Sequence, residues 1–158
     1  MIIPVYVDNQ FDKSDPEPMH LIPSNVFEEL WSSTPKTQWG TCRMSDYLLP
    51  DCVDNVSPFV IQYVDNYFYY KAGRISFAEN PTNGCFIRFN EGRHRTRWLL
   101  DNNCKYIPIG IRGSLRSKVL EAYNLTDSLV KPGSHIDLPF TKESVIKLHK
   151  SQLNETLE

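Results

Sequence analysis

The residues from 85 to 112 constrain the fold of this chain more than any other segment. An apolar run, Phe86-Ile87-Arg88-Phe89, is typical of a strand, and Asn90-Glu91-Gly92 follows it as a turn. Residues 93–103 then have the composition of a helix, and residues 106–112 again read as an apolar strand. The segment therefore predicts a strand–turn–helix–strand unit.

Two details refine this unit. Asn102-Asn103 can adopt the left-handed conformation that ends a helix, so the predicted helix stops there. Pro108 has no amide hydrogen to donate to a neighbouring strand. The strand over 106–112 is therefore expected at a sheet edge, or to begin near Pro108.

The rest of the chain alternates strand and helix patterns. Strands are expected at residues 1–8, 58–64, 67–71 and 74–77. Helices are expected at residues 25–31, 115–124 with Ser114 as cap, and 141–148. Loops or turns are expected at residues 8–23, 80–84 and 131–140. These patterns predict an α+β fold with a small mixed sheet flanked by helices, in one domain over 1–150 with a frayed tail over 151–158.

Composition narrows the classes of protein that the chain can belong to. Its 158 residues suit one domain, and no apolar run approaches the roughly 20 residues of a membrane helix. The N-terminus lacks the pattern of a signal peptide, so a cytoplasmic protein without membrane insertion is expected. Cys42, Cys52, Cys85 and Cys104 form no C-x-x-C pair, which favours reduced, half-buried thiols over a zinc site.

Positive charge gathers around the predicted unit. Residues 88–118 hold eight Lys or Arg residues against two acidic ones, although the whole chain has a formal net charge of −2. A helix start presents free backbone N–H groups and the positive end of a dipole. Gly92, Arg93, His94 and Arg95 at this start predict a site for a phosphate or another anion.

Each of these residues also has a plain structural interpretation. Gly92 could serve the turn alone, and Arg95, the best candidate for clamping a phosphate, could pair with a local acid. His94 could bind phosphate, act as an acid or base, or cap the helix. Glu91 could hold magnesium or orient a water, or pair with Arg93 or Arg95. Glu91 and His94 are thus the candidate catalytic residues.

Neighbouring residues carry further expectations. Arg93 and Arg97 share a helix face, so one could line the site while the other is solvated. Trp98 is expected in the core, and Asp101 is expected to pair with Arg97 or a neighbouring strand. Arg112, Ser114 and Arg116 form a weaker, secondary anion site. The aromatic run over 67–70 favours a sheet core with one wet face over a platform for stacking bases.

The order Gly92-Arg93-His94-Arg95 followed by Ile107-Pro108-Ile109 resembles the ParB/sulfiredoxin superfamily. Within this superfamily the chain is most similar to the plasmid fertility inhibition factor family. This similarity rests on Arg74-Ile75-Ser76-Phe77, Trp98-Leu99 and Asp101 in addition to the residues above. This resemblance implies a ParB/sulfiredoxin-like fold and a turn that binds nucleotide phosphates. It also implies interference with conjugative DNA transfer at the coupling step of type IV secretion. One member of the family is reported to combine ATPase with DNase activity.

The resemblance has limits that exclude some functions. Arg93 occupies the position of sulfiredoxin's reactive cysteine, which argues against repair of oxidised peroxiredoxin. The chain after Arg112 is too short for the DNA-reading domain of partition proteins. The expected partners are a conjugative coupling protein, transferred DNA and a nucleotide, with ATP and Mg²⁺ as the implied cofactors. The alternatives are a magnesium-dependent ATPase or DNase, and a nucleic-acid-binding module without catalysis.

Overall fold

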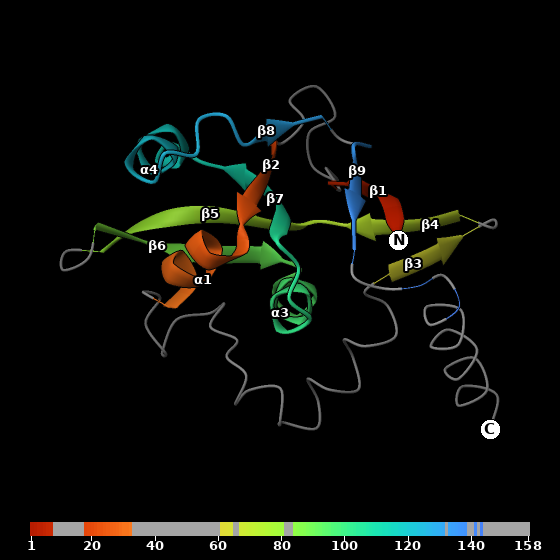
Figure 1. The fold of residues 1–158 in the computed structure, drawn as a ribbon. Coiled ribbons are helices and arrows are strands. Elements are labelled where there is room, and N and C mark those ends of the chain that lie inside the picture. The colour runs from red at the N-terminus through yellow and green to blue at the C-terminus, as the bar shows by residue number, and fades with distance from the viewer. Residues whose placement is uncertain are drawn as a thin grey trace.

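A computed structural model describes residues 1–7, 18–32, 61–64, 67–80, 84–131, 133–138, 141 and 143. Within these residues the chain forms two sheets and three helices (Figure 1). The strands are β1 (Ile2–Tyr6), β2 (Met19–Pro23), β3 (Ile61–Val64), β4 (Tyr67–Lys71), β5 (Gly73–Asn80), β6 (Gly84–Glu91), β7 (Tyr106–Arg112), β8 (Leu129–Val130) and β9 (His135–Asp137). The helices are α1 (Ser24–Ser32), α3 (Arg93–Asp101) and α4 (Arg116–Ala122). The expected α+β class is confirmed.

Both sheets are mixed. One has the strand order β3-β4-β1-β9, and the other has the order β6-β5-β7-β2-β8. Each contains one parallel pair, β1 with β4 and β5 with β7, among antiparallel neighbours. Only Ala72 separates β4 from β5, so one length of chain runs from the first sheet into the second (Figure 1). The prediction of a single small sheet was therefore too simple.

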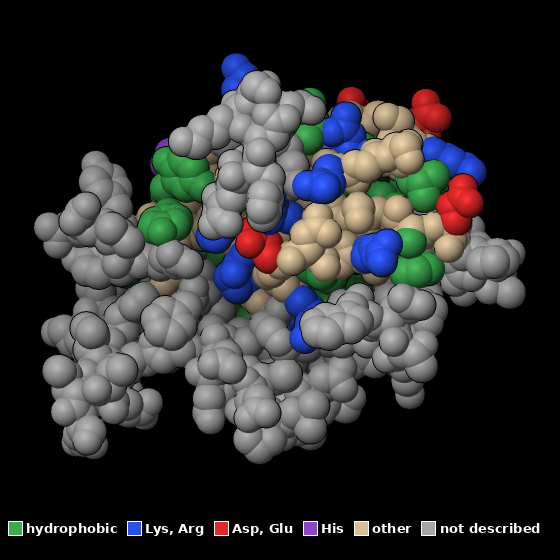
Figure 2. Space-filling view, turned by 180° about the vertical axis from the view of Figure 1, so that it is seen from behind, with side chains coloured by type: hydrophobic (Ala, Val, Ile, Leu, Met, Phe, Trp, Pro, Cys, Tyr) green, Lys and Arg blue, Asp and Glu red, His purple; other side chains and the backbone are tan. Residues whose placement is uncertain are grey.

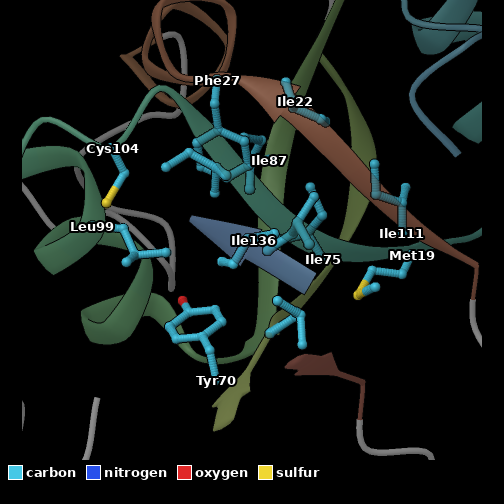
Figure 3. Packing of buried hydrophobic residues seen from close by; sticks show 14 of the residues in the cluster. Met19, Ile22, Phe27, Tyr70, Ile75, Ile87, Leu99, Cys104, Ile111 and Ile136 are labelled. Carbon is cyan, nitrogen blue, oxygen red and sulfur yellow. The ribbon is translucent and has the colours of Figure 1, made fainter. Parts of the chain in front are cut away.

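One continuous core lies against the inner faces of both sheets. Ile75, Phe77 and Ile87 alternate with more exposed residues along β5 and β6 and are buried. Helix α1 covers this face with Phe27 and Trp31 (Figures 1 and 3). Apolar burial of this kind is the main stabilising term of a domain.

The strand–turn–helix–strand unit forms with nearly the predicted bounds. Helix α3 ends at Asp101, and Asn103 follows with a left-handed φ of 61°, which confirms the predicted stop. Trp98 packs half-buried against the core, and Arg97 Nη1 lies 3.8 Å from Asp101 Oδ1, as expected. The position of β7 differs from the prediction, because it lies in the middle of the five-stranded sheet.

The register explains how Pro108 is tolerated in a central strand. Pro108 pairs with Leu21 of β2, but the Leu21 N–H donates away from β7, to the Ser128 carbonyl at 2.8 Å. The pair therefore exchanges no hydrogen bond, and the Pro108 nitrogen faces the β5 side. Pairing with β5 begins one residue later, at Gly73 and Ile109. The second part of the expectation, a strand that begins near Pro108, agrees with the start of β7 at Tyr106.

Three local predictions were wrong. Residues 19–23 and 135–137, expected as loop, form β2 and β9, because each finds partners far away in sequence. Helix α4 begins after Leu115, without a side-chain cap from Ser114. The predicted helix over 141–148 and the tail over 151–158 lie almost wholly outside the described residues.

The aromatic run over 67–70 forms β4 as a half-buried strand. Tyr70 is fully buried, whereas Tyr69 is half-buried and meets exposed Tyr6 edge-to-face at 6.1 Å. This is the expected sheet core with one wet face. Among the described residues, no helix is long and apolar enough to cross a membrane.

Candidate phosphate-binding turn

The turn between β6 and α3 depends on a contact between two glycines. Gly92 caps α3 with a φ of 82°, a conformation that L side chains rarely adopt. A Cβ on Gly92 would lie 2.5 Å from the Gly73 Cα, at the start of β5. The close approach that Gly92 permits is therefore made by the protein's own backbone. This contact supports the interpretation that Gly92 serves the turn itself.

The first turn of α3 keeps the features of an anion site. The earliest bond within the helix runs from the Thr96 N–H to the Gly92 carbonyl at 3.0 Å. The N–H groups of residues 93–95 consequently have no acceptor within the helix. Gly92, the N-cap residue, has no side chain that could cap this end, and the first turn contains no acidic residue. An anion there would meet the backbone N–H groups of a helix start, the helix dipole and basic side chains.

Arg95 holds the turn against the sheet. Its Nε donates to the Lys71 carbonyl at 2.9 Å, at the end of β4. Its Nη2 is packed 2.8 Å from the place of a Gly92 Cβ and has no hydrogen-bond partner among the described residues. Part of the guanidinium is therefore used on the fold, and the predicted phosphate-clamping role remains a prediction.

Tyr70 lies beneath the same turn. Its hydroxyl points toward α3, on the side where Leu99 also packs (Figure 3). Burial raises the pKa of Tyr70 well above its ordinary value, and nearby Arg95 and Thr96 offset this only in part. The tyrosine is therefore a neutral neighbour of the Arg95 guanidinium.

Glu91 has cationic partners that the sequence did not indicate. Its Oε1 lies 3.2 Å from Arg74 Nε and 3.8 Å from Lys71 Nζ. The expected pairing with Arg93 or Arg95 is replaced by these contacts. Two cations beside one carboxylate disfavour a metal ion there, and no group of three His, Cys, Asp or Glu residues forms within the described ranges. The described residues therefore do not fit a magnesium site.

Arg97 neither lines the turn nor faces solvent. It is buried, donates to both carboxylate oxygens of Glu28 at 2.9 and 3.0 Å, and stacks 4.5 Å from the Trp31 ring centroid. The expectation that Arg93 or Arg97 is solvated therefore fails for Arg97. Arg93 is half-buried at the start of the helix, whereas the His94 side chain lies outside the described residues.

The secondary anion site is not brought together. Arg112 and Ser114 are exposed, and Arg112 pairs across the sheet with Ser76 of β5. Arg116 lies near His20 and contributes to the lowered pKa of that side chain. His20 pairs with Ile109, which points to the face of the sheet opposite to Arg112. Arg116, near His20, and Arg112 are therefore associated with opposite faces of the sheet.

Sequence reasoning missed Lys71, Arg74 and Glu28 as partners of the site. The sequence did indicate that Arg74 lies near the end of the strand that precedes the α3 turn. Counting the same number of residues back and forward from the turn at 80–84 places Arg74 opposite Asn90, next to Glu91. A register shift between Arg74 and Ile75 brings Glu91 there instead. No local pattern could identify Glu28, which lies 69 residues before Arg97.

No protein-family model, curated protein or solved structure matches the chain.

Proposed function

We propose that this chain is a phosphate-binding protein of the fertility-inhibition type, with a ParB/sulfiredoxin-like fold. Its β6–α3 turn would bind a phosphate group of a nucleotide or of transferred DNA. Acting in the cytoplasm, it would interfere with conjugative transfer at the coupling step of type IV secretion. The conjugative coupling protein and the transferred DNA are the proposed partners.

The observation that carries the proposal is the basic first turn of α3, which begins directly after a glycine. Gly92 has no side chain to occupy the N–H groups of this turn, and Arg93, His94 and Arg95 follow it without an acidic residue. The Gly92 and Gly73 contact fixes the turn in place before any ligand arrives. A rigid group of donors binds an anion with a smaller entropic cost than a mobile one.

Binding is better supported than hydrolysis. The candidate base Glu91 is ion-paired with Arg74, so it is a weak candidate for holding magnesium or activating water. The magnesium-dependent ATPase or DNase and the non-catalytic nucleic-acid module remain alternatives that the same experiment separates.

Nucleotide binding tests the site directly. Fluorescently labelled ATP would be titrated with the wild-type protein and with Arg93→Ala, with and without MgCl₂. Loss of one charged donor should weaken binding about tenfold. Lys105→Ala is the matched control, because it removes one positive charge from an exposed position beyond the other end of α3. Equal affinities for the two variants would contradict the site.

Phosphate release measured in the same samples separates the enzyme alternative. Turnover that disappears in Glu91→Gln would favour hydrolysis, whereas binding without turnover favours the proposal. For the cellular role, donor cells expressing the wild-type protein should transfer a conjugative plasmid less often than cells expressing Arg93→Glu. Unchanged transfer across several plasmids would remove the fertility-inhibition proposal.

A further inference from the structure

A row of residues crosses three strands on the outer face of the five-stranded sheet. Ser76 of β5 pairs with Arg88 of β6 on one side and with Arg112 of β7 on the other. Directly paired residues point to the same face of a sheet. Arg88 and Arg112 are both exposed, and we call these three residues the arginine row.

The arginine row lies on the face opposite to the core. Its strand neighbours Ile75, Phe77 and Ile87 point inward and are buried, while the row alternates with them. Figure 2 views the molecule from behind and shows Lys and Arg side chains spread over this side, around acidic atoms near the middle. Helix α1 packs through Phe27 on Phe89, which pairs with Ile75 on the opposite face, so this helix does not cover the row.

The surroundings of the row are small and flat. Ala78 lies two residues after Ser76 on the same face of β5 and is half-buried. A Cβ added to Gly113 would lie 3.6 Å from the Ser76 Cβ. The small neighbours are consistent with the exposure of Arg88 and Arg112 on this face. Two strand spacings separate Arg88 from Arg112, so their backbones lie about 10 Å apart.

Buried Arg74 lies between the row and the start of α3. Arg74 lies two residues before Ser76 on the same face of β5, and it pairs with Glu91 at the end of β6. Arg88 precedes Glu91 by three residues, which places the row about 10 Å along the strand from the α3 turn. Among the described residues between the row and the α3 turn, Glu91 carries the one carboxylate.

From this arrangement we infer that the outer face of β5, β6 and β7 binds the phosphate backbone of a nucleic acid. The inference deepens the proposed function, because it extends the phosphate site of the α3 turn along the sheet. The phosphates of one nucleotide are too close together to reach both the turn and the row. A chain of phosphates spans that distance, and arginine binds phosphate oxygens through two parallel donors.

The row contains guanidinium groups and a hydroxyl but no exposed aromatic side chain. These groups bind phosphates and carry no direct information about base sequence. Binding should therefore be independent of sequence and steeply dependent on salt.

Salt-dependent binding to a labelled 20-nucleotide DNA of mixed sequence, in single- and double-stranded form, tests the inference. The double variant Arg88→Ala/Arg112→Ala removes two phosphate contacts, so the slope of log affinity against log salt should fall by about 2 for the duplex. Affinity at low salt should fall at least about tenfold. Arg88→Lys/Arg112→Lys should retain most of the slope because it keeps the charge.

The control variant Lys105→Ala/Lys131→Ala removes the same charge from two exposed positions outside the row, at the start of β7 and after β8. A slope that falls equally in the control and in the row variant would overturn the inference. Displacement of the protein by polyglutamate as effective as that by DNA would also overturn it, in favour of an acidic protein partner.

Binding of labelled ATP, measured on the same variants, separates the two proposals. ATP binding without DNA binding would overturn the backbone surface alone. DNA binding that depends on the row, without ATP binding, would overturn the nucleotide site at the α3 turn alone.

Discussion

At the residue scale, Gly92 meets two separate demands. Its φ of 82° favours glycine, and its Cα packs against Gly73 so closely that a Cβ would lie 2.5 Å from the Gly73 Cα. Gly133 meets only the first demand, because it has a φ of 87° but its nearest neighbour would be 3.7 Å away, on Tyr6. Comparing the two glycines separates backbone strain from steric overlap.

We expect Gly92→Ala to lower the free energy of unfolding by about 3 kcal/mol, because it adds an overlap with backbone to the left-handed strain. Gly133→Ala should cost about 1 kcal/mol, since it introduces the strain alone. Urea unfolding followed by tryptophan fluorescence measures both. Equal losses for the two variants would show that the glycine contact contributes nothing.

His20 is a buried titratable group outside the candidate site. Its Nδ1 lies 2.9 Å from Ser128 Oγ, and that hydroxyl donates its proton to the Leu125 carbonyl at 2.6 Å. Nδ1 therefore carries the proton, and the buried Nε2 has no hydrogen-bond partner among the described residues. Burial, and then the charge of Arg116, lower the pKa of His20 from 6.5 to about 4.

This lowered pKa predicts a loss of stability in acid. Between pH 6.5 and about 4 the unfolded chain binds a proton at His20 that the folded chain does not, so stability falls as the pH falls. The contribution is on the order of 3 kcal/mol. His20→Asn can keep the bond to Ser128 without titrating, so its unfolding free energy should change less over this window. Identical pH dependence for the two proteins would contradict the assignment.

At the element scale, Arg97 joins α3 to α1. Its guanidinium binds both oxygens of Glu28, lies over Trp31, and reaches Asp101 at 3.8 Å. The Arg97 side chain is 8% exposed and that of Glu28 is 46% exposed, so the pair lies at the edge of the core. Its energy should fall between that of a surface pair and that of a fully buried one.

A double-mutant cycle with Arg97→Met and Glu28→Gln should give a coupling energy of about 1–2 kcal/mol. Methionine retains much of the packing on Trp31, so the cycle reports mainly the charged contact. A second cycle with Asp101→Asn should give a smaller value, because the distance between Arg97 and Asp101 is longer. Coupling to Asp101 equal to or greater than that to Glu28 would contradict this ranking.

The elements themselves could largely be predicted where the signal is local. The strand at 106–112 and the helix start at Arg93 follow from apolar patterning and from Gly92. Short strands could not be predicted, because β2 and β9 owe their conformation to β7 and β1, which lie far away in sequence. The same limit applied to the site, since a single bulge decided that Glu91 faces Arg74.

At the scale of the whole molecule, the two sheets share one core. Val5 of β1 and Ile109 of β7 are both fully buried and belong to the same cluster, although they come from different sheets. The chain crosses between the sheets at Ala72, which is also fully buried. Because both sheets contribute residues to this one cluster, the sheets are expected to unfold together.

Truncation of Val5 tests this cooperativity. Val5→Ala should cost about 2 kcal/mol, and the most slowly exchanging amides of β7 should lose as much protection as those of β1 and β4. Ile2→Ala, on the same strand but 68% exposed, should change neither group measurably. Hydrogen exchange followed by NMR gives both values. Loss of protection confined to β1 and β4 would show that the sheets unfold separately, because a shared core would transmit the same free-energy change to β7.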